Sequence, residues 1–115
     1  MRDAVAFKVL TATEKDTLEA DGRFAGSADD RRDGFIHLST AAQLTGTVDK
    51  HFARQDNLWL AEVDLDALGD QVRWEPSRGG EEFPHLYGNL PLDCVVAYSP
   101  LERAPDGSVR LPITG

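Results

Sequence analysis

The sequence has little cysteine and no long apolar run, and both absences exclude classes of protein. Cys94 is the only cysteine among 115 residues, so no disulfide can form within the chain. It lies in the apolar run CVVAY, where a buried, unreactive thiol is expected. No apolar run approaches the roughly 20 residues that a membrane-spanning helix needs. The N-terminal stretch MRDAVAFKVL lacks the apolar segment and cleavage site of a signal peptide. We therefore expect a cytoplasmic protein that does not contact membranes.

Positive charge is also scarce. Twelve Lys and Arg stand against 20 Asp and Glu, which gives a formal net charge of -8. General binding to nucleic acid requires a basic surface and is not expected here. A local basic site is still compatible with this composition, because arginine suits bidentate phosphate recognition. Arg32, just ahead of the segment DGFIHLST, is the candidate for such a contact.

Several common site motifs are missing. The chain contains no Gly-x-Gly-x-x-Gly, no P-loop and no G-x-S-x-G nucleophile elbow. Its three histidines, at positions 37, 51 and 85, are 14 and 34 residues apart. Three imidazoles and a water would suit zinc, but the close spacing common among metal-binding histidines is absent. A metal site is therefore not favoured.

The length and the 41% hydrophobic content predict one domain, residues 1–115. Strands are expected at 4–10, 34–39, 58–65, 71–76 and 93–102, and 108–112 should pair back through a turn at 104–107. The segment 58–65 has large residues on both faces, so it should be a central strand. Two short helices are expected at 14–20 and 41–53, and loops at 22–34 and 77–89. This order predicts an α+β fold with a mainly antiparallel sheet.

The two expected helices have different boundary signals. Thr13 is the predicted N-cap of the first helix, and Gly22 is its predicted stop. Thr40 and Gln43 form a predicted capping box at the start of the second.

The segment DGFIHLST, residues 33–40, has a histidine in an otherwise apolar strand. With a period of two, Phe35, His37 and Ser39 share one face. Ile36 and Leu38 share the other face and should enter the core. The strand therefore predicts one apolar face and one face that carries an imidazole and a hydroxyl.

The other two histidines also have apolar neighbours. His51 projects within about 20° of Leu44 on a helical wheel of about 100° per residue, so it should point inward from the stripe of Leu44, Val48 and Phe52. His85 lies in FPHLYG, residues 83–88, which is too apolar for a solvated loop. If this segment is extended, His85 and Tyr87 share a face. We predict that His37, His51 and FPHLYG meet at one cleft; the alternative is that each histidine is a hydrogen-bonded core residue.

A polar pocket for a ribose or a phosphate suits these residue types. His37 and Ser39 would be roughly 6.6 Å apart along a strand, and each can donate or accept a hydrogen bond. Trp74 could stack on a planar ring, and Glu75 could supply a carboxylate.

The whole chain resembles a family of short, mostly bacterial, single-domain proteins. The resemblance is carried by FKVL (7–10), GRFAGSADDRRDGFIHLST (22–40), the segment from Thr47 to Phe52, VRWE (72–75) and FPHLYG (83–88). This family is similar to the ADP-ribosyltransferase-like fold, an α+β fold with a split antiparallel sheet around a cleft that binds NAD in the active enzymes. FIHLST also resembles a histidine-bearing strand of RNA 2′-phosphotransferases, which share that fold. The resemblance implies that His37 and Ser39 hold the ribose that carries nicotinamide.

Three hypotheses follow. The first is an NAD- or nucleotide-dependent transferase related to ADP-ribosyltransferases, with NAD as the cofactor. Its catalytic residues would be His37, Glu75 and His85, and its cofactor-binding residues Arg32, Ser39, Thr40, His51, Trp74 and Tyr87. The second is a non-catalytic module that binds a nucleotide-like or phosphorylated small molecule in the same cleft. The third is a protein-interaction domain with structural histidines.

Overall fold

The computed structural model describes residues 3–111, apart from the side chain of Arg78. Its strands are β1 (Val5–Thr11), β2 (Arg23–Phe24), β3 (Ile36–His37), β4 (Leu58–Asp64), β5 (Val72–Pro76), β6 (Glu82–Leu86), β7 (Leu90–Pro91) and β8 (Val95–Pro100). Its helices are α1 (Ala12–Asp21), α2 (Ala28–Asp33), α3 (Ala41–His51) and α4 (Leu65–Leu68). Short 3-10 turns precede β5, β6 and β8.

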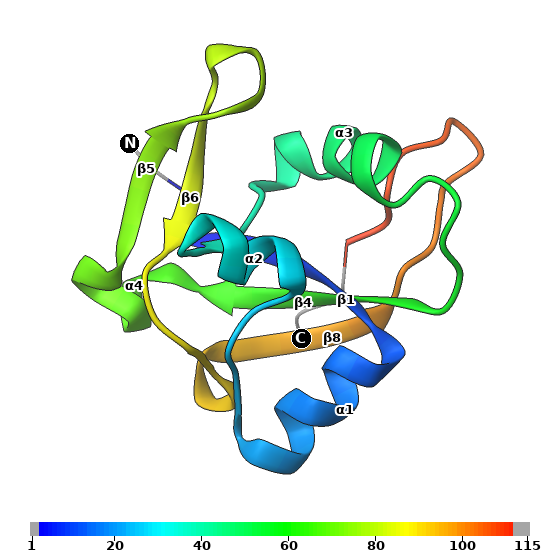
Figure 1. Cartoon of the computed structure of the whole chain (residues 1–115). Coiled ribbons are helices and arrows are strands. Elements are labelled where there is room, and N and C mark those ends of the chain that lie inside the picture. The colour runs from blue at the N-terminus through cyan, green and yellow to red at the C-terminus, as the bar shows by residue number, and fades with distance from the viewer. Residues whose placement is uncertain (1–2, 112–115) are drawn as a thin grey trace.

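The strands form three antiparallel sheets, with the orders β1-β4-β8, β3-β6-β5 and β2-β7. The expectation of a central strand at 58–65 is confirmed, because β4 pairs on both sides. In Figure 1 the sheet β1-β4-β8 crosses the lower half of the molecule, and the hairpin β5-β6 rises beside it. A single bridge joins these two sheets: Phe7 and Ser39 exchange both backbone hydrogen bonds, at 2.7 and 3.0 Å. The antiparallel arrangement is thus split next to β1.

Apolar side chains cover both faces of the sheet β1-β4-β8. On one face, Leu44 and Val48 of α3 pack with Phe7, Val9, Leu58 and Leu60. On the other face, Leu18 of α1 packs with Ala6, Leu10, Ala61 and Val63. Figure 1 shows these two helices on opposite sides of the sheet. The same second core receives Ile36 and Leu38, as the alternation in DGFIHLST predicts.

Side-chain caps explain where α1 and α3 begin. The capping box of Thr40 and Gln43 is confirmed at the start of α3. The predicted Thr13 cap is wrong: α1 begins one residue after Thr11, whose side chain accepts from the Glu14 N–H while Glu14 accepts from Thr11. The Gly22 stop is confirmed, since Gly22 adopts φ +74° and donates to Leu18.

Both long loops expected from the sequence contain regular structure. The segment 22–34 holds β2 and the six-residue helix α2, because Ser27 and Asp30 form a third capping box. The segment 77–89 holds β6, the middle strand of the sheet β3-β6-β5. The expectation of two helices is therefore too low: the part of the chain that the structure describes has four. The expected pairing of 108–112 is reduced to one bridge, Arg103 to Val109, and residue 112 lies outside the described residues.

Candidate functional site

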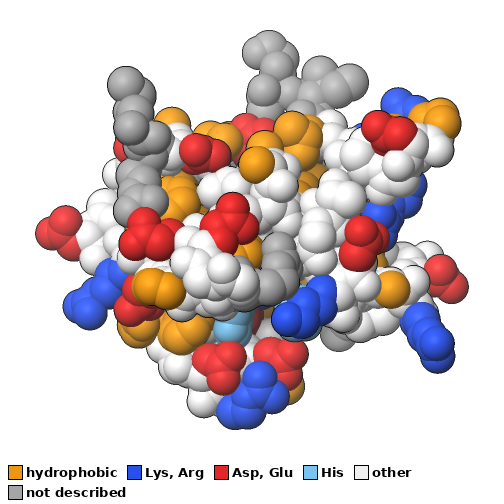
Figure 2. All heavy atoms as spheres, turned by 90° about the horizontal axis from the view of Figure 1, so that it is seen from above, with side chains coloured by type: hydrophobic (Ala, Val, Ile, Leu, Met, Phe, Trp, Pro, Cys, Tyr) orange, Lys and Arg blue, Asp and Glu red, His pale blue; other side chains and the backbone are white. Residues whose placement is uncertain are grey.

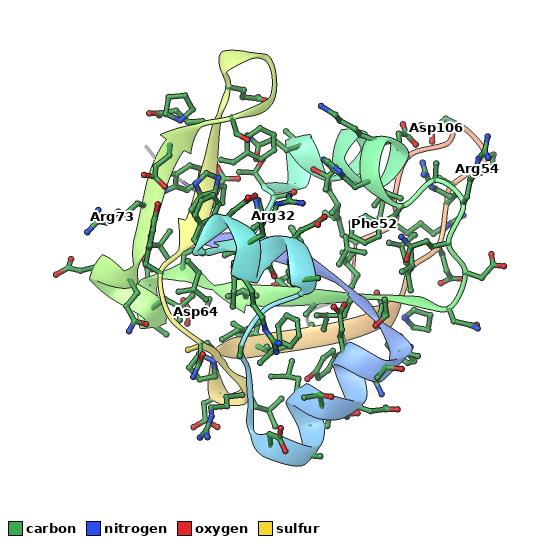
Figure 3. All side chains as sticks on the ribbon, in the orientation of Figure 1. Arg32, Phe52, Arg54, Asp64, Arg73 and Asp106 are labelled. Atoms are coloured by element: carbon green, nitrogen blue, oxygen red, sulfur yellow. The ribbon has the colours of Figure 1, made fainter. Side chains whose placement is uncertain are left out.

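A cleft of about 290 Å³ opens where the two larger sheets separate. Its lining comes from β1, α2, β3, α3 and β6, so segments far apart in the sequence meet there. Its polar side chains include Lys8, Asp30, Asp33, His37, Ser39, Thr47, Lys50, His51 and His85. Figure 3 shows α2, with Arg32 labelled, between the β5-β6 hairpin and α3. In the space-filling view of Figure 2, histidine is visible as one small patch beside acidic and basic side chains.

Asp30 of α2 is the centre of a buried polar network at one side of this cleft. Its carboxylate is 2% exposed and lies 2.9 and 3.1 Å from Lys8 Nζ. The ring of His37 places Nδ1 2.7 Å from Asp30 Oδ1, and the backbone N–H of His37 donates to the same oxygen. The Ser27 N–H donates to Oδ2, and Lys8 also donates to the His37 carbonyl at 3.2 Å. One carboxylate thus joins β1, α2 and β3.

The charge of Asp30 is stabilised despite its burial. Burial alone would raise the pKa of this carboxyl. The hydrogen bond with His37, the charge of Lys8 and the Ser27 N–H outweigh that effect and hold the pKa of Asp30 well below its usual range. Asp30 is therefore ionised at neutral pH, and it fixes the orientation of the His37 ring.

The second nitrogen of His37 is also occupied. Nε2 lies 2.9 Å from Asp33 Oδ2, and the His37 side chain is 37% exposed. Hydrogen bonding to Arg32, assisted by His37, holds the pKa of Asp33 below its usual range. The Asp33 side chain is 35% exposed, so it can turn toward solvent and release Nε2.

A pair of hydroxyls continues the polar surface from β3 to α3. Ser39 Oγ lies 2.8 Å from Thr47 Oγ1, and the Thr47 hydroxyl donates to the Gln43 carbonyl at 3.2 Å. With Thr47 donating in that direction, Ser39 donates to Thr47 and keeps its oxygen lone pairs available. Ser39 is thus an acceptor in a cleft that it lines.

His85 lies on β6, the strand that pairs with β3, and its side chain lines the same cleft. It pairs with His37 in register, and the two ring centroids are 5.9 Å apart. His85 Nδ1 lies 2.8 Å from Glu75 Oε1, which also accepts from the Tyr87 hydroxyl at 2.7 Å. The ring stacks on Phe35 with a centroid distance of 3.9 Å. The prediction that His37, His51 and FPHLYG meet at one cleft is confirmed, because Phe83 and His85 line it with the other two histidines.

Glu75 does not reach the cleft that it was predicted to serve. It lies beyond the lining, where the Tyr87 hydroxyl and His85 donate to it and hold its pKa below the usual range. The His85 imidazole therefore lies between Glu75 and the cleft. Glu75 was predicted to stabilise developing positive charge or to act as a base, and the structure places its carboxylate outside the cleft, in contact with His85 and Tyr87.

The predicted binding residues divide into two groups. Arg32 and His51 line the cleft beside Ser39, and both are exposed. His51 ends α3 and lines the cleft, so the alternative that it is a core residue is wrong and its predicted place at the cleft is confirmed. Arg32 lies 3.2 Å from both Asp29 and Asp33. Three other predicted residues, Thr40, Trp74 and Tyr87, lie outside the lining.

Local structure explains why these three lie elsewhere. The Thr40 hydroxyl is occupied as the N-cap of α3. Trp74 packs against the apolar core, because strand alternation points it to the face opposite Arg73 and Glu75. Tyr87 lies beyond Phe35, beneath the Arg73 guanidinium, whose central carbon is 5.0 Å from the ring centroid. Figure 3 shows Arg73 extending outward from β5.

Sequence reasoning missed Lys8 and Asp30. A signal for each was present: Lys8 shares its strand face with Ala6 and Leu10, so an inward charge was to be expected. Ser27 and Asp30 have the spacing of a capping box.

Within residues 3–111, no group of three or more His, Cys, Asp or Glu side chains is arranged to hold a metal ion. None of the helices described has the length and apolar composition needed to cross a bilayer.

The fold and cleft define a small α+β domain with antiparallel sheets and a polar, histidine-lined cleft. The chain belongs to the family described as "Protein of unknown function (DUF952)", whose model matches residues 9–98.

Solved structures of one bacterial protein are similar to this chain. The X-ray structure of protein CC0527 from Caulobacter crescentus is similar, with 43% identity and a TM-score of 0.84, over 92% of this chain and 93% of that chain. The solution NMR structure of CC0527 has 43% identity and a TM-score of 0.79, over 93% and 91% of the two chains. A search among curated proteins found no significant match.

Proposed function

We propose that this protein binds a ribose-containing nucleotide in the cleft, with NAD as the first candidate, and that it transfers a group from that ligand. The observation that carries the proposal is the convergence of His37, His85 and Ser39 on one cleft. Each imidazole is oriented by a carboxylate, and Ser39 is oriented by Thr47. Fixed hydrogen-bonding groups of this kind suit the closely spaced hydroxyls of a ribose.

The size of the cleft limits how much of the ligand it can enclose. Small-molecule sites commonly measure about 300–1,000 Å³, and this cleft of about 290 Å³ lies at the lower limit. It suits a nucleoside or one half of a dinucleotide, and the other half would lie outside. Phe7, Phe52 and Phe83 in the lining supply the apolar surface that a base or nicotinamide ring needs.

The ribose would contact both sides of the bridge that joins the sheets. One hydroxyl would donate to Ser39 Oγ. A second would bind His37 Nε2 after Asp33 turns toward solvent. Phosphate would face Lys50 and Arg32, which line the cleft and are exposed. The likeness to the ADP-ribosyltransferase-like fold, with its split antiparallel sheet, supports NAD as the first ligand to test.

Calorimetric and thermal titrations with NAD, ADP-ribose and AMP test the proposal. A ligand at 100 times its Kd adds about 2.7 kcal/mol, which corresponds to a rise in Tm of roughly 10 °C for a domain of this size. We expect NAD to stabilise the protein, His37→Ala and Ser39→Ala to weaken binding, and Glu102→Gln, an exposed change outside the cleft, to leave it unchanged. No stabilisation by any of the three ligands at millimolar concentration would refute the proposal.

A binding module without catalysis is the second candidate. The position of Glu75 favours it, because this carboxylate lies behind His85 and cannot stabilise charge on a ligand directly. Stoichiometric NAD binding with no nicotinamide released over days would select this candidate.

A further inference from the structure

His85 has one ring nitrogen in use and the other available. Nδ1 is held by Glu75 at 2.8 Å, whereas Nε2 has no hydrogen-bond partner among the described residues. The side chain is 5% exposed and lines the cleft, while Glu75 lies outside the lining. The ring edge that carries Nε2 is therefore the edge that meets the cleft.

Its neighbours hold this ring in one orientation. Phe35 stacks on it at a centroid distance of 3.9 Å and an interplanar angle of 20°. The two hydrogen bonds that Glu75 accepts fix the carboxylate that orients Nδ1. Because Nδ1 donates to an ionised carboxylate, the neutral ring carries its proton on Nδ1 and a lone pair on Nε2. His37 differs, since Asp30 and Asp33 occupy both of its nitrogens.

We propose that His85 is the general base of the transfer, and that the acceptor is a hydroxyl group, from water or an alcohol, that loses its proton to Nε2. This inference rests on the proposed function, which supplies the donor. It separates the roles of the two histidines: His37 holds the ligand, and His85 activates the group that attacks it. Glu75 is a positioning residue, because it acts only through the imidazole.

The step balances with NAD as the donor. The acceptor O–H bond breaks, and the proton passes to His85 Nε2. The acceptor oxygen bonds to ribose C1′ as the bond from C1′ to the nicotinamide nitrogen breaks. That electron pair returns to the positively charged ring, so nicotinamide leaves neutral and needs no proton. One base is therefore sufficient, and the Glu75 carboxylate stabilises the imidazolium that forms.

Two measurements on the full chain test the proposal. The first is the ¹⁵N NMR tautomer signature of His85 in the wild-type protein, which requires no variant and no ligand. We expect His85 to be in the Nδ1–H form. Glu75→Gln should reduce the fraction of this tautomer and should leave Tyr87 and the fold in place. An Nε2–H tautomer in the wild type would overturn the proposal.

The second is the rate of nicotinamide release from NAD as a function of pH, with water or methanol as the acceptor. General bases typically contribute about 10²–10⁴-fold to a rate. We expect His85→Asn to lower the rate about 100-fold or more and to abolish its pH dependence, with little change in the Kd for NAD. Asparagine can still donate to Glu75, so the variant keeps that contact. Glu75→Gln should cause a smaller loss, and Glu102→Gln should cause none.

The outcomes distinguish this inference from the proposed function. Binding of NAD without nicotinamide release, or release at an unchanged rate in His85→Asn, would overturn the role of His85 and leave ligand binding in place. Absence of NAD binding in the titration would refute the proposed function, and the inference would fall with it.

Discussion

Lys8→Met is the substitution that best tests the buried network around Asp30. Methionine keeps the length and apolar stem of lysine but removes the ammonium, which is 7% exposed and bonds both Asp30 oxygens. Breaking a buried ion pair typically costs about 3–5 kcal/mol, because an uncompensated charge is left behind. Asp30 keeps the His37 ring and two backbone N–H groups. We therefore expect a loss near the lower limit, about 3 kcal/mol.

The effect of a second substitution, Asp30→Asn, on stability should have opposite signs in the wild type and in Lys8→Met. In the wild type, Asp30→Asn leaves Lys8 buried without a counter-charge and should be destabilising. In Lys8→Met, the same change removes the uncompensated carboxylate while retaining an acceptor oxygen, so it should be stabilising. Urea unfolding of the four proteins at pH 7 measures this cycle. Lys15→Met, in an exposed pair with Glu19, is the matched control and should cost about 1 kcal/mol or less.

Two results would refute this reasoning. One is a cost of Lys8→Met no larger than that of Lys15→Met. The other is that Asp30→Asn destabilises both backgrounds equally, because the carboxylate would then gain nothing from the ammonium.

Acid titration gives the same network a second readout. The pKa of Asp30 is lower in the folded protein than the ordinary value of about 3.9. The unfolded chain therefore takes up the proton first, and the stability from ionised Asp30 is present above about pH 4 and lost as the pH falls toward the folded pKa. The stability difference between wild type and Asp30→Asn should thus be largest at neutral pH and shrink in acid. A difference that grows in acid would contradict the assigned direction.

Four further predictions concern Ile36, His37, Cys94 and Gly26. In urea unfolding, Ile36→Ala should cost about 2–5 kcal/mol, because Ile36 is core. His37→Ala should cost only about 1–2 kcal/mol, because the ring is partly exposed and Asp30 keeps other partners; equal costs would make His37 a structural residue. Cys94 should resist thiol reagents until the protein unfolds, because burial raises the pKa of its thiol, and labelling at the rate of a free thiol would contradict this. Gly26→Ala should cost about 1–3 kcal/mol or more on thermal unfolding, since Gly26 adopts φ +114° and an added Cβ would lie 2.8 Å from Asp30 Cβ; an unchanged Tm would contradict this.

Periodicity and capping predicted the parts of the fold that local chemistry determines. Alternation in DGFIHLST correctly placed Ile36 and Leu38 in the core. The capping box correctly placed the start of α3 at Thr40. Alternation in FPHLYG also placed His85 and Tyr87 on one face, where both donate to Glu75. Each of these results depends on residues close together in the chain.

The elements that sequence reasoning missed depend on distant contacts. The helix α2 is six residues long and polar, and an isolated helix of this length is unstable in water. Its central residue Asp30 is held by Lys8, 22 positions earlier. No local pattern shows that pairing. The two-residue strands β2 and β7 likewise exist only because residues near 24 and 90 meet.

The position of Asp30 has a consequence for how this family evolves. The same carboxylate supports the fold and orients His37, so selection for a folded chain alone would preserve Lys8 and Asp30 even in relatives that had lost every activity. Retention of these two residues is therefore uninformative about function. The informative residues are those that line the cleft outside this network, above all His85 with its available Nε2 and the exposed Asp33. Relatives that differ at these positions would mark where the cleft has changed its chemistry while the domain has stayed intact.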